Sequence, residues 1–436
     1  MDPCGGGACT GSQRGATSRR SLVCIVLAAV PLVLSFVVPN ANGTPGLPAM
    51  RGVTGPMGSV EPQVTAGPTL SEWTPGPSAG RLSSSVTILD QAGDVGRWSS
   101  VRIGSDGLAL ISYFDYTNWD LKVAHCEDLA CRRASIATVD RADAVGTHSS
   151  LSIGVDGLGL ISYHDFTHGY LKVAHCMDVR CSSATFSVVD STTNAGDFGT
   201  SIAIGSDGLA LVAYMDVTNA ALKVAHCSDI VCHSATLSSL DRSGLSGELS
   251  HVAIGDDGLG LISYFDEATS VLKVAHCSNV LCTSASVTTL TEAGGAGGAS
   301  AVAIGSDGLG IIPSFTRSGF FRIAHCSDVP CTSATISTVD GSGNIGASAA
   351  VATTGRGFPL LGYTDVVIGN VNLVFCSNTA CTASSVVTVD RVPNGGWDMA
   401  MTIGMDGNAL VTYYDPGDRD LRVVHLSNPL AMSRPG

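Results

Sequence analysis

The residues of this sequence best suited to chemistry are aspartates that recur at one place in a repeated pattern, two residues after a tyrosine. They are Asp115, Asp165, Asp216, Asp266, Asp365 and Asp415. Because Asp side chains readily accept hydrogen bonds from nearby backbone N–H groups, we predict that each caps its loop as an Asx turn. The alternative is a ring of carboxylates on one face that collects a polar ligand or a cation such as Ca²⁺. No other cofactor is predicted.

A second group of candidate residues differs from copy to copy of the pattern. Positions that are the same in most copies should serve the shared fold, whereas variable positions are freer to serve a ligand. The candidates are Trp98, Trp119, His148, Phe166, His168, Tyr170, Phe198, Arg317, Trp397 and Arg419. Exposed aromatic rings beside carboxylates bind sugars by stacking and hydrogen bonding, and they also anchor protein partners. The alternative is that these rings only cover loop backbone.

Familiar catalytic motifs are absent from the sequence. No G-x-S-x-G elbow, H-E-x-x-H, P-loop or dinucleotide fingerprint occurs in a fitting context. A hydrolase with paired carboxylates stays open, because Asp is abundant on the expected ligand face, but nothing singles out one pair. No catalytic residue is therefore predicted.

Twelve cysteines form six C-x4-C pairs, each at the same place in the pattern. The pairs are Cys126 with Cys131, Cys176 with Cys181, Cys227 with Cys232, Cys277 with Cys282, Cys326 with Cys331 and Cys376 with Cys381. Paired cysteines in short loops of an exported chain favour disulfides. Zinc is an alternative because a histidine precedes most pairs, but each copy offers three ligands where structural zinc needs four, so no metal site is predicted. Free thiols are the third possibility.

These residues belong to a unit that recurs seven times with a period of about fifty residues. The first copy, IGSDGLALISYFDYTNWDLKVAHC, covers residues 103–126. Each unit contains four short apolar or alternating segments separated by turns such as Asp106-Gly107, which indicates four strands. Connections within a unit are short, and the longest connection leads to the next unit. The strand before the Asp-Gly turn is therefore innermost and the strand ending in Val-Asp is outermost.

The number of outer strands indicates how the units close. Copies one to six have one each, but the seventh copy ends without one, while 84–90 (SSVTILD) stands alone before the first copy. A ring can pair this segment with 421–426, whereas an open solenoid would leave two unpaired edges. The sequence thus predicts an all-β fold: a seven-bladed β-propeller of four-stranded blades over residues 84–428. The variable positions lie in the loops between second and third strands and in the crossovers between blades, which emerge on one face.

Copies five and six depart from the pattern. Pro313, Ser314 and Thr316 replace the usual Ser, Tyr and Asp, and Arg317 follows them. In copy six Arg356 replaces the turn aspartate, and a phenylalanine replaces the histidine. This sector is either specialised for a partner or drifting.

The repeats resemble the sialidase-like (BNR-type) superfamily of propellers, and more closely the tandem ISYYD…LKVAHC repeats of exported bacterial proteins of unassigned function. The resemblance covers about residues 84–428 and implies the propeller fold, an extracellular setting and often glycan binding. The S-x-D-x-G-x-T-W Asp box does not occur, although Ser105–Leu108 echoes it. The arginines are scattered among non-equivalent positions, so the catalytic residues of sialidases are not transferred to this chain.

The N-terminal segment predicts export. Three arginines precede an apolar run at 21–38, which is the layout of a secretory signal or an uncleaved signal anchor within residues 1–43. Residues 44–83 are rich in Pro and Gly and are predicted to be a disordered linker, and 429–436 a C-terminal tail. The protein is therefore expected to be secreted or extracytoplasmic, with membrane contact only through 21–38.

Charge narrows the range of partners. The net charge of −14 and the lack of a basic stripe exclude nucleic acid as a partner. We predict a monomeric, non-catalytic binding propeller that recognises a glycan or an extracellular protein through its crossover loops. The alternatives are a glycoside hydrolase or lyase with acidic residues on that face, and a purely structural surface repeat.

Overall fold

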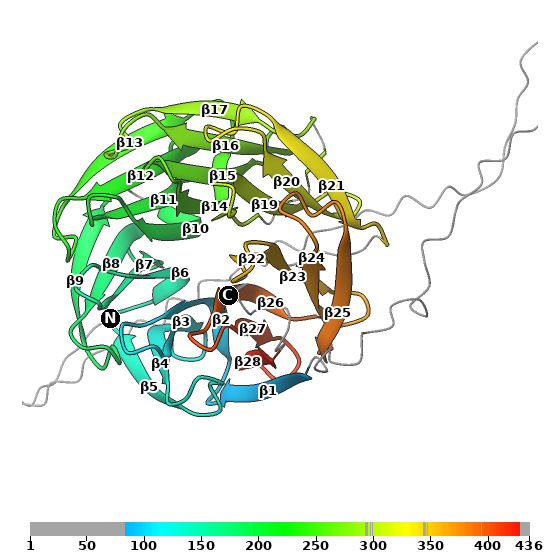
Figure 1. Cartoon of the computed structure of the whole chain (residues 1–436). Coiled ribbons are helices and arrows are strands. Elements are labelled where there is room, and N and C mark those ends of the chain that lie inside the picture. The colour runs from blue at the N-terminus through cyan, green and yellow to red at the C-terminus, as the bar shows by residue number, and fades with distance from the viewer. Residues whose placement is uncertain are drawn as a thin grey trace, which may run out of the picture. The chain divides into compact units, whose positions relative to one another are not determined.

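The computed structural model describes residues 83–192, 194–292, 295–296, 298, 300–342, 346, 348–393 and 395–427. These residues form seven four-stranded antiparallel sheets that surround a central axis as the blades of a β-propeller (Figure 1). The predicted fold class is confirmed. The predicted signal segment (1–43), nearly all of the predicted linker (44–83) and the predicted tail (429–436) lie outside the described residues.

Each blade runs from an inner strand at the axis to an outer strand at the rim. The inner strands are β2 (Val95–Ile103), β6 (Val145–Ile153), β10 (Ala195–Ile204), β14 (Ser246–Ile254), β18 (Ala303–Ile304), β22 (Ala349–Thr353) and β26 (Trp397–Ile403). The second strands are β3 (Ala109–Asp115), β7 (Gly159–Asp165), β11 (Ala210–Asp216), β15 (Gly260–Asp266), β19 (Gly310–Phe315), β23 (Pro359–Asp365) and β27 (Ala409–Asp415). We number the blades 1 to 7 in this order.

The third and outer strands complete the blades. The third strands are β4 (Asp120–Cys126), β8 (Tyr170–Cys176), β12 (Ala221–Cys227), β16 (Val271–Cys277), β20 (Phe321–Cys326), β24 (Asn370–Cys376) and β28 (Asp420–Ser427). The outer strands of blades 1 to 6 are β5 (Ala134–Asp140), β9 (Ala184–Asp190), β13 (Ala235–Asp241), β17 (Ala285–Thr289), β21 (Ala334–Asp340) and β25 (Ser384–Arg391). Blade 7 takes its outer strand, β1 (Ser83–Asp90), from the other end of the chain.

The predicted ring closure is confirmed by the pairing of β1 with β28. The two strands are antiparallel, with Val86 opposite Val424 and Ser84 opposite Leu426. The closing pair gives blade 7 the strand order β1-β28-β27-β26, which matches the other six blades. Neither end of the ring is left with an open edge, because the last blade contains strands from both ends of the repeat region.

Burial explains why the second strands are almost continuously apolar. Every residue of β3 is buried, because neighbouring blades cover both faces of the strand. Apolar side chains of adjacent blades form one core per interface; between blades 1 and 2, for example, Leu110 and Val123 pack with Ile161. The outer strands instead alternate between half-buried and exposed side chains.

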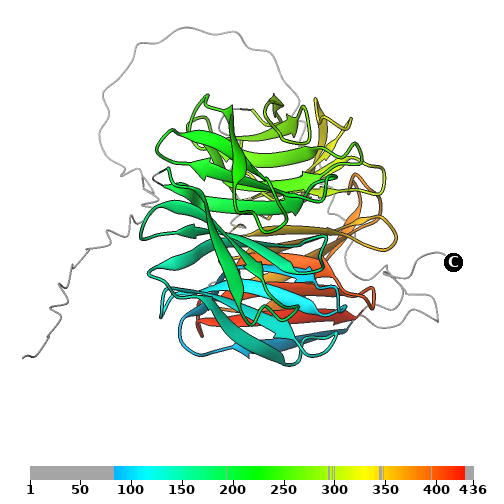
Figure 2. The same ribbon diagram turned by 90° about the vertical axis from the view of Figure 1, so that its left-hand side faces the viewer.

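The two faces of the ring carry different loops. Loops between second and third strands, and crossovers between blades, emerge on what we call the crossover face. The Asp-Gly turns and the cysteine loops emerge on the opposite cysteine face; Figure 2 shows the blades from the side. Gly107 has a φ of 81° in its turn, which explains why Gly is needed there. The described residues include no helix that could span a membrane.

All six predicted disulfides form on the cysteine face, one in each of blades 1 to 6. The bonds join Cys126 with Cys131, Cys176 with Cys181, Cys227 with Cys232, Cys277 with Cys282, Cys326 with Cys331 and Cys376 with Cys381. The predicted pairing is confirmed, and these twelve cysteines are neither free thiols nor zinc ligands. Disulfides in this number are typical of a protein that matures outside the reducing cytosol.

The backbone of the second cysteine in each pair was not predicted, because the pairs were placed only in a simple connection between two strands. The first cysteine ends a third strand, whereas the second lies in the loop, where Cys131 N donates to Asp128 O at 3.0 Å. A positive φ, between 49° and 59°, is found at Cys131, Cys181, Cys232, Cys282, Cys331 and Cys381. This left-handed backbone costs a non-glycine residue about 1–2 kcal/mol. The connection is therefore a tight turn, in which the disulfide joins a strand end to a strained residue.

Beside the disulfides, six blades place the recurrent histidine against the turn aspartate, and in five of them, all but blade 3, the contact is a hydrogen bond. In blade 1, His125 Nε2 lies 2.8 Å from Asp106 Oδ2. The equivalent pairs in the other blades have similar distances. Blade 6 lacks the pair, because Phe375 and Arg356 stand at the two positions. The contact connects the third strand of a blade to the turn between its first two strands.

Blade 5 is the irregular blade. Its inner strand β18 has only two residues, Ala303 and Ile304, which pair with Ile311 and Gly310 of β19. Pro313 pairs with Ile323 of β20 but lies beyond the short ladder with β18, so its missing backbone N–H costs no hydrogen bond to the inner strand. The proline that looked awkward in the sequence is thus accommodated by a shortened neighbour.

Candidate functional site on the crossover face

An axial pocket of about 130 Å³ lies where the first halves of the inner strands meet. All seven blades contribute to its lining, which includes Trp98, His148, Leu249, Ser300, Ser348 and Asp398. Inner strands run from the crossover face toward the cysteine face, so these early residues lie toward the crossover face.

A bulge in the inner strand shapes this pocket. The residue at the bulge has a positive φ, at 49° for Trp98, 54° for His148, 50° for Leu249 and 54° for Asp398. The strand pairing shifts register at the same place. Such bulges redirect a side chain, and a left-handed backbone at a bulky residue is a strained feature that is common near functional sites. The side chains that line the pocket are held there by this local geometry.

Hydroxyl groups on the following residue connect the bulges around the axis. Ser149 Oγ donates to the carbonyl of Trp98 at 2.9 Å, and Thr200 Oγ1 donates to the carbonyl of His148 at 2.8 Å. Ser99 Oγ makes the same contact with the carbonyl of Asp398 at 3.0 Å. Each bulge is therefore fixed by the next blade. These hydroxyls were not predicted, although a Ser or Thr after the variable position is visible in the repeats.

Four of the predicted ligand residues form one aromatic cluster in blades 1 and 2. The ring centroids of Trp98 and His148 are 4.4 Å apart, and those of Trp98 and Phe114 are 5.4 Å apart. Phe114 contacts Trp119 at 5.9 Å, and Trp119 contacts Phe166 at 5.4 Å. The cluster extends from the pocket to the rim of the crossover face, and Phe166 is 44% exposed at its outer end. It therefore offers ring faces beside a cavity.

The other predicted ligand residues lie apart from this cluster. His168 and Tyr170 stack on each other at 5.5 Å in blade 2, and His168 also bonds Asp165. Phe198 and Trp397 are exposed on β10 and β26. The remaining two candidates, Arg317 and Arg419, are exposed in the loops of blades 5 and 7.

The electrostatics of the pocket set the protonation of its side chains. Burial, with a smaller contribution from His164, lowers the pKa of His148 to about 3, so its imidazole is neutral at neutral pH. Burial raises the pKa of Asp398. Burial and the nearby Glu267 raise the pKa of Glu248, next to the pocket residue Leu249, to about 7. Two carboxyl groups of this region thus hold protons at higher pH than usual.

The six recurrent aspartates are buried or half-buried at the start of the loops between second and third strands. Each accepts backbone N–H bonds from its own loop, as in Asn118 N to Asp115 Oδ1 at 3.0 Å and Asn219 N to Asp216 Oδ1 at 3.0 Å. This is the geometry of a turn cap. No group of three or more His, Cys, Asp or Glu side chains in the described part of the chain is arranged to hold a metal ion. Binding of Ca²⁺ stays a prediction.

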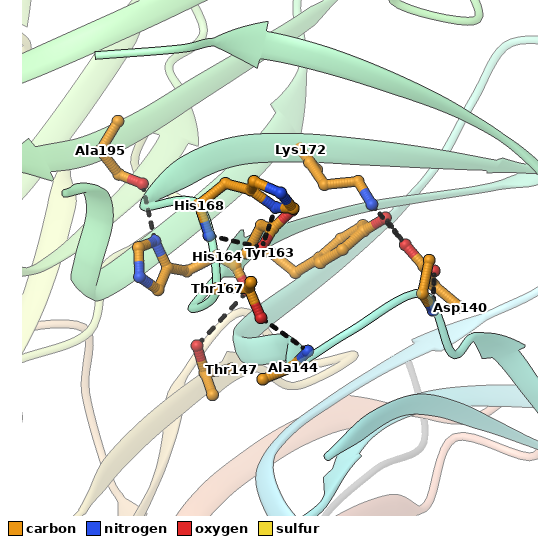
Figure 3. A network of polar contacts seen from close by, with 11 residues as sticks. Asp140, Ala144, Thr147, Tyr163, His164, Thr167, His168, Lys172 and Ala195 are labelled. Carbon is orange, nitrogen blue, oxygen red and sulfur yellow. Dashed lines mark hydrogen bonds and ion pairs between the residues drawn. The ribbon is translucent and has the colours of Figure 1, made fainter. Parts of the chain in front are cut away.

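A buried polar network that was not predicted from the sequence connects neighbouring blades. Between blades 1 and 2, Asp140 at the end of β5 accepts bonds from Tyr163 at 2.7 Å and Lys172 at 2.6 Å (Figure 3). Burial alone would raise the pKa of Asp140, but the bonds from Lys172 and Tyr163 hold it below its usual value. We call each such contact a junction and number it by its two blades, so this one is junction 1/2.

Comparison with solved structures finds proteins of similar fold at low sequence identity. An α-L-arabinofuranosidase from Fusarium graminearum, solved with an iminosugar inhibitor, matches 80% of this chain and 98% of its own at a TM-score of 0.50 and 11% identity. The NanB sialidase from Streptococcus pneumoniae matches 79% of this chain and 70% of its own at a TM-score of 0.45 and 10% identity. No protein-family model and no curated protein matches the sequence.

Proposed function

We propose that this protein acts on carbohydrate and that a sugar ring occupies the axial pocket on the crossover face. The observation that carries the proposal is the aromatic cluster formed by Trp98, His148, Phe114, Trp119 and Phe166, which leads into a cavity lined by all seven blades. Aromatic faces stack on the apolar faces of sugars, and the pocket hydroxyls and Asp398 supply hydrogen bonds.

The proposed function can take two forms, glycan binding alone and glycan hydrolysis. Hydrolysis is supported by the fold likeness to an arabinofuranosidase and by the protonation of Glu248. A carboxyl with a pKa of about 7 still carries its proton near neutral pH and can donate it to a leaving group, while a second carboxyl acts as base or nucleophile. Asp398 is the carboxyl of the pocket itself and takes that second role in this proposal. A lyase would use the same acid and base.

The test combines a glycan array with an assay for released sugar. We expect Trp98→Ala to abolish glycan binding, and Glu248→Gln to abolish release while binding is kept. His168→Ala changes an aromatic residue outside the cluster and should leave both unchanged. Release should fall as pH rises above about 7, because Glu248 must be protonated to act as the acid.

Three outcomes separate the possibilities. Binding without release supports the non-catalytic form. Release that survives Glu248→Gln contradicts the assignment of the acid. If no glycan binds, or if Trp98→Ala binds as the unchanged protein does while its urea unfolding is normal, the carbohydrate proposal is wrong.

We propose further that the protein is monomeric and exported, and that residues 21–38 are either removed or retained as an anchor. The six disulfides support an oxidising compartment. The N-terminal residue of the exported protein, determined by mass spectrometry, distinguishes a cleaved signal from a retained one.

A further inference from the structure

Most junctions between blades share one polar arrangement. An aspartate at the end of an outer strand accepts bonds from a tyrosine and a cation of the next blade, as Asp190 does from Tyr214 at 2.6 Å and Lys223 at 2.5 Å. The second-strand aspartate of that blade approaches the same cation, with Asp216 at 3.4 Å from Lys223. Ion pairs to the outer-strand aspartate occur at junctions 7/1, 1/2, 2/3, 3/4 and 6/7.

Junction 4/5 has the cation of this arrangement but none of the three side chains that contact the cation elsewhere. Thr291 stands where the outer-strand aspartate would be, and Ser314 where the tyrosine would be. Thr316 replaces the second-strand aspartate, which leaves Arg322 at the position of Lys223. The three substitutions remove two carboxylates and a phenol from the surroundings of one guanidinium.

Arg322 consequently lacks a counter-ion among the described residues. Its Nε atom is buried and has no hydrogen-bond partner there, and it forms no ion pair with a described side chain. Positions 293, 294, 297 and 299 of the adjoining crossover are Ala or Gly, so they cannot supply a carboxylate. An uncompensated guanidinium in such a place is unfavourable, and an anion from solution would remove that penalty.

The missing side chains leave space for such an anion. A pocket of about 840 Å³ lies at this junction, and its lining includes Thr291, Thr316, Arg317, Ser318 and Arg322. The hydroxyl of Thr291 accepts a bond from Leu272 N at 2.9 Å, so its proton is free to point into the pocket. Two guanidinium groups and the four hydroxyls of Thr291, Thr316, Ser318 and Thr338 therefore border one cavity.

Glu292 is the one acidic side chain in the lining of this pocket. It is exposed, and it does not come within ion-pair distance of Arg322. Its charge should weaken the binding of an anion without filling the vacant position. Replacing Glu292 with Gln is therefore expected to tighten binding by a few-fold.

We propose that junction 4/5 binds a carboxylate group from solution, held by Arg322 and Arg317 in the place of the missing aspartates. Carboxylate is the chemistry that the other junctions use, and a guanidinium binds it through two parallel N–H bonds. The group comes either from a small free acid or from an acidic sugar. The site is distinct from the axial pocket, so this proposal does not depend on the proposed carbohydrate function.

The test is titration of the propeller with acetate and with glucuronate at constant ionic strength, followed by the melting temperature and by calorimetry. Chloride and phosphate serve as controls for unspecific anion effects. We expect saturable binding of carboxylate in the unchanged protein. Tighter binding of glucuronate than of acetate identifies an acidic sugar as the source, and equal binding identifies a free acid.

Matched variants make the outcome decisive. Thr291→Asp supplies the carboxylate internally and should raise the melting temperature in carboxylate-free buffer and weaken acetate binding by more than tenfold. Thr291→Asn has the same shape without the charge and should keep binding. Arg322→Met should abolish binding, and Arg132→Ala, an exposed arginine on the cysteine face, should not change it.

The proposal is overturned if the unchanged protein shows no saturable carboxylate binding. It is also overturned if chloride binds equally well at the same ionic strength, or if Thr291→Asp binds acetate as tightly as Thr291→Asn does. Should Thr291→Asp fail to fold, loss of binding in Arg322→Met together with retention in Arg132→Ala gives the same decision.

Discussion

Junction 1/2 and junction 5/6 occupy equivalent places in the ring but are stabilised by different interactions. In junction 1/2 the carboxylate of Asp140 is bonded by Tyr163 and by Lys172. In junction 5/6 the carboxylate of Asp340 is bonded by Tyr363 at 2.5 Å, but Asn372 stands at the position of the lysine. One junction is a buried ion pair, and the other is an acid with hydrogen bonds alone.

The two irregular junctions are opposite in charge. Junction 4/5 has the cation without its acids, and junction 5/6 has the acids, Asp340 and Asp365, without a cation. On the cysteine face of blade 6, the Asp and the His of a recurrent pair are likewise replaced together, by Arg356 and Phe375. The apolar cores of blades 5 and 6 nevertheless form as in the other blades. We infer that apolar packing between blades is sufficient for the fold, and that the polar network can change locally.

The difference between the two junctions is tested most directly by removing the carboxylate charge from each of them. We expect Asp140→Asn to lower the free energy of unfolding by about 3–5 kcal/mol, because it leaves the buried ammonium of Lys172 without its partner. Asp340→Asn should cost about 1 kcal/mol, because only hydrogen bonds are weakened. Urea denaturation of both variants measures the difference.

The same two variants can also contradict this explanation. If Asp340→Asn costs as much as Asp140→Asn, the ion pair with Lys172 does not distinguish the two junctions. Unfolding slopes should match the unchanged protein, since neither variant alters the surface exposed on unfolding.

Acid should act on the ion-paired junctions in a defined pH window. Burial alone would raise the pKa of Asp190, but bonds from Lys223, Thr192 and Tyr214 lower it to about 2 from an ordinary 3.8. A carboxyl with a lowered folded-state pKa stabilises the fold above its ordinary pKa, and the stabilisation is lost as pH falls through the folded value. The urea concentration at the midpoint of unfolding should therefore decrease as the pH is lowered from 3.8 to about 2.

Asp190→Asn is the control for this window. The variant should be less stable than the unchanged protein at about pH 5, and the gap should narrow toward about pH 2, where the carboxyl of Asp190 takes up its proton. A gap that stays constant over this whole range would mean that Asp190 does not contribute through its charge.

The architecture could be predicted from the sequence because it depends on counting. Seven units, six outer strands in place and one orphan at 84–90 permit a single closed arrangement, and the pairing of β1 with β28 follows. The disulfides were equally accessible, since each C-x4-C pair is confined to one short loop. The spacing of the cysteines and the number of strands, both visible in the sequence, were enough to predict the disulfides and the ring.

The site was predicted only in part, for a physical reason. Variation among copies identified Trp98, Trp119, His148 and Phe166, which the fold brings together. Asp398 was missed because it reaches the pocket through a left-handed bulge. A positive φ is uncommon even at Asp, where it is enriched, so the residue type alone does not indicate the bulge. The left-handed backbone of the second cysteine in each disulfide loop was missed for the same reason.

The junction networks were missed for a different reason. Their members lie 23 and 32 residues apart in different blades, as Asp140, Tyr163 and Lys172 do. Spacing along the chain does not show such contacts. Their joint loss at one junction, with Thr291 at the end of copy four and Ser314 and Thr316 in copy five, was the available signal.

The smallest expected effect comes from building the missing pair into junction 5/6. Asn372→Lys would place an ammonium near Asp340 and Asp365, as Lys273 lies 3.0 Å from Asp241 and 2.7 Å from Asp266. We expect a gain of about 1 kcal/mol in the free energy of unfolding, because charge pairing is offset by desolvation of the lysine. The bond from Thr388 to Asn372 at 2.8 Å is lost in the exchange. Urea denaturation of the double variant with Asp340→Asn completes the cycle. If the lysine is as stabilising without the Asp340 charge as with it, pairing is not the cause, and the two junctions differ by more than their charges.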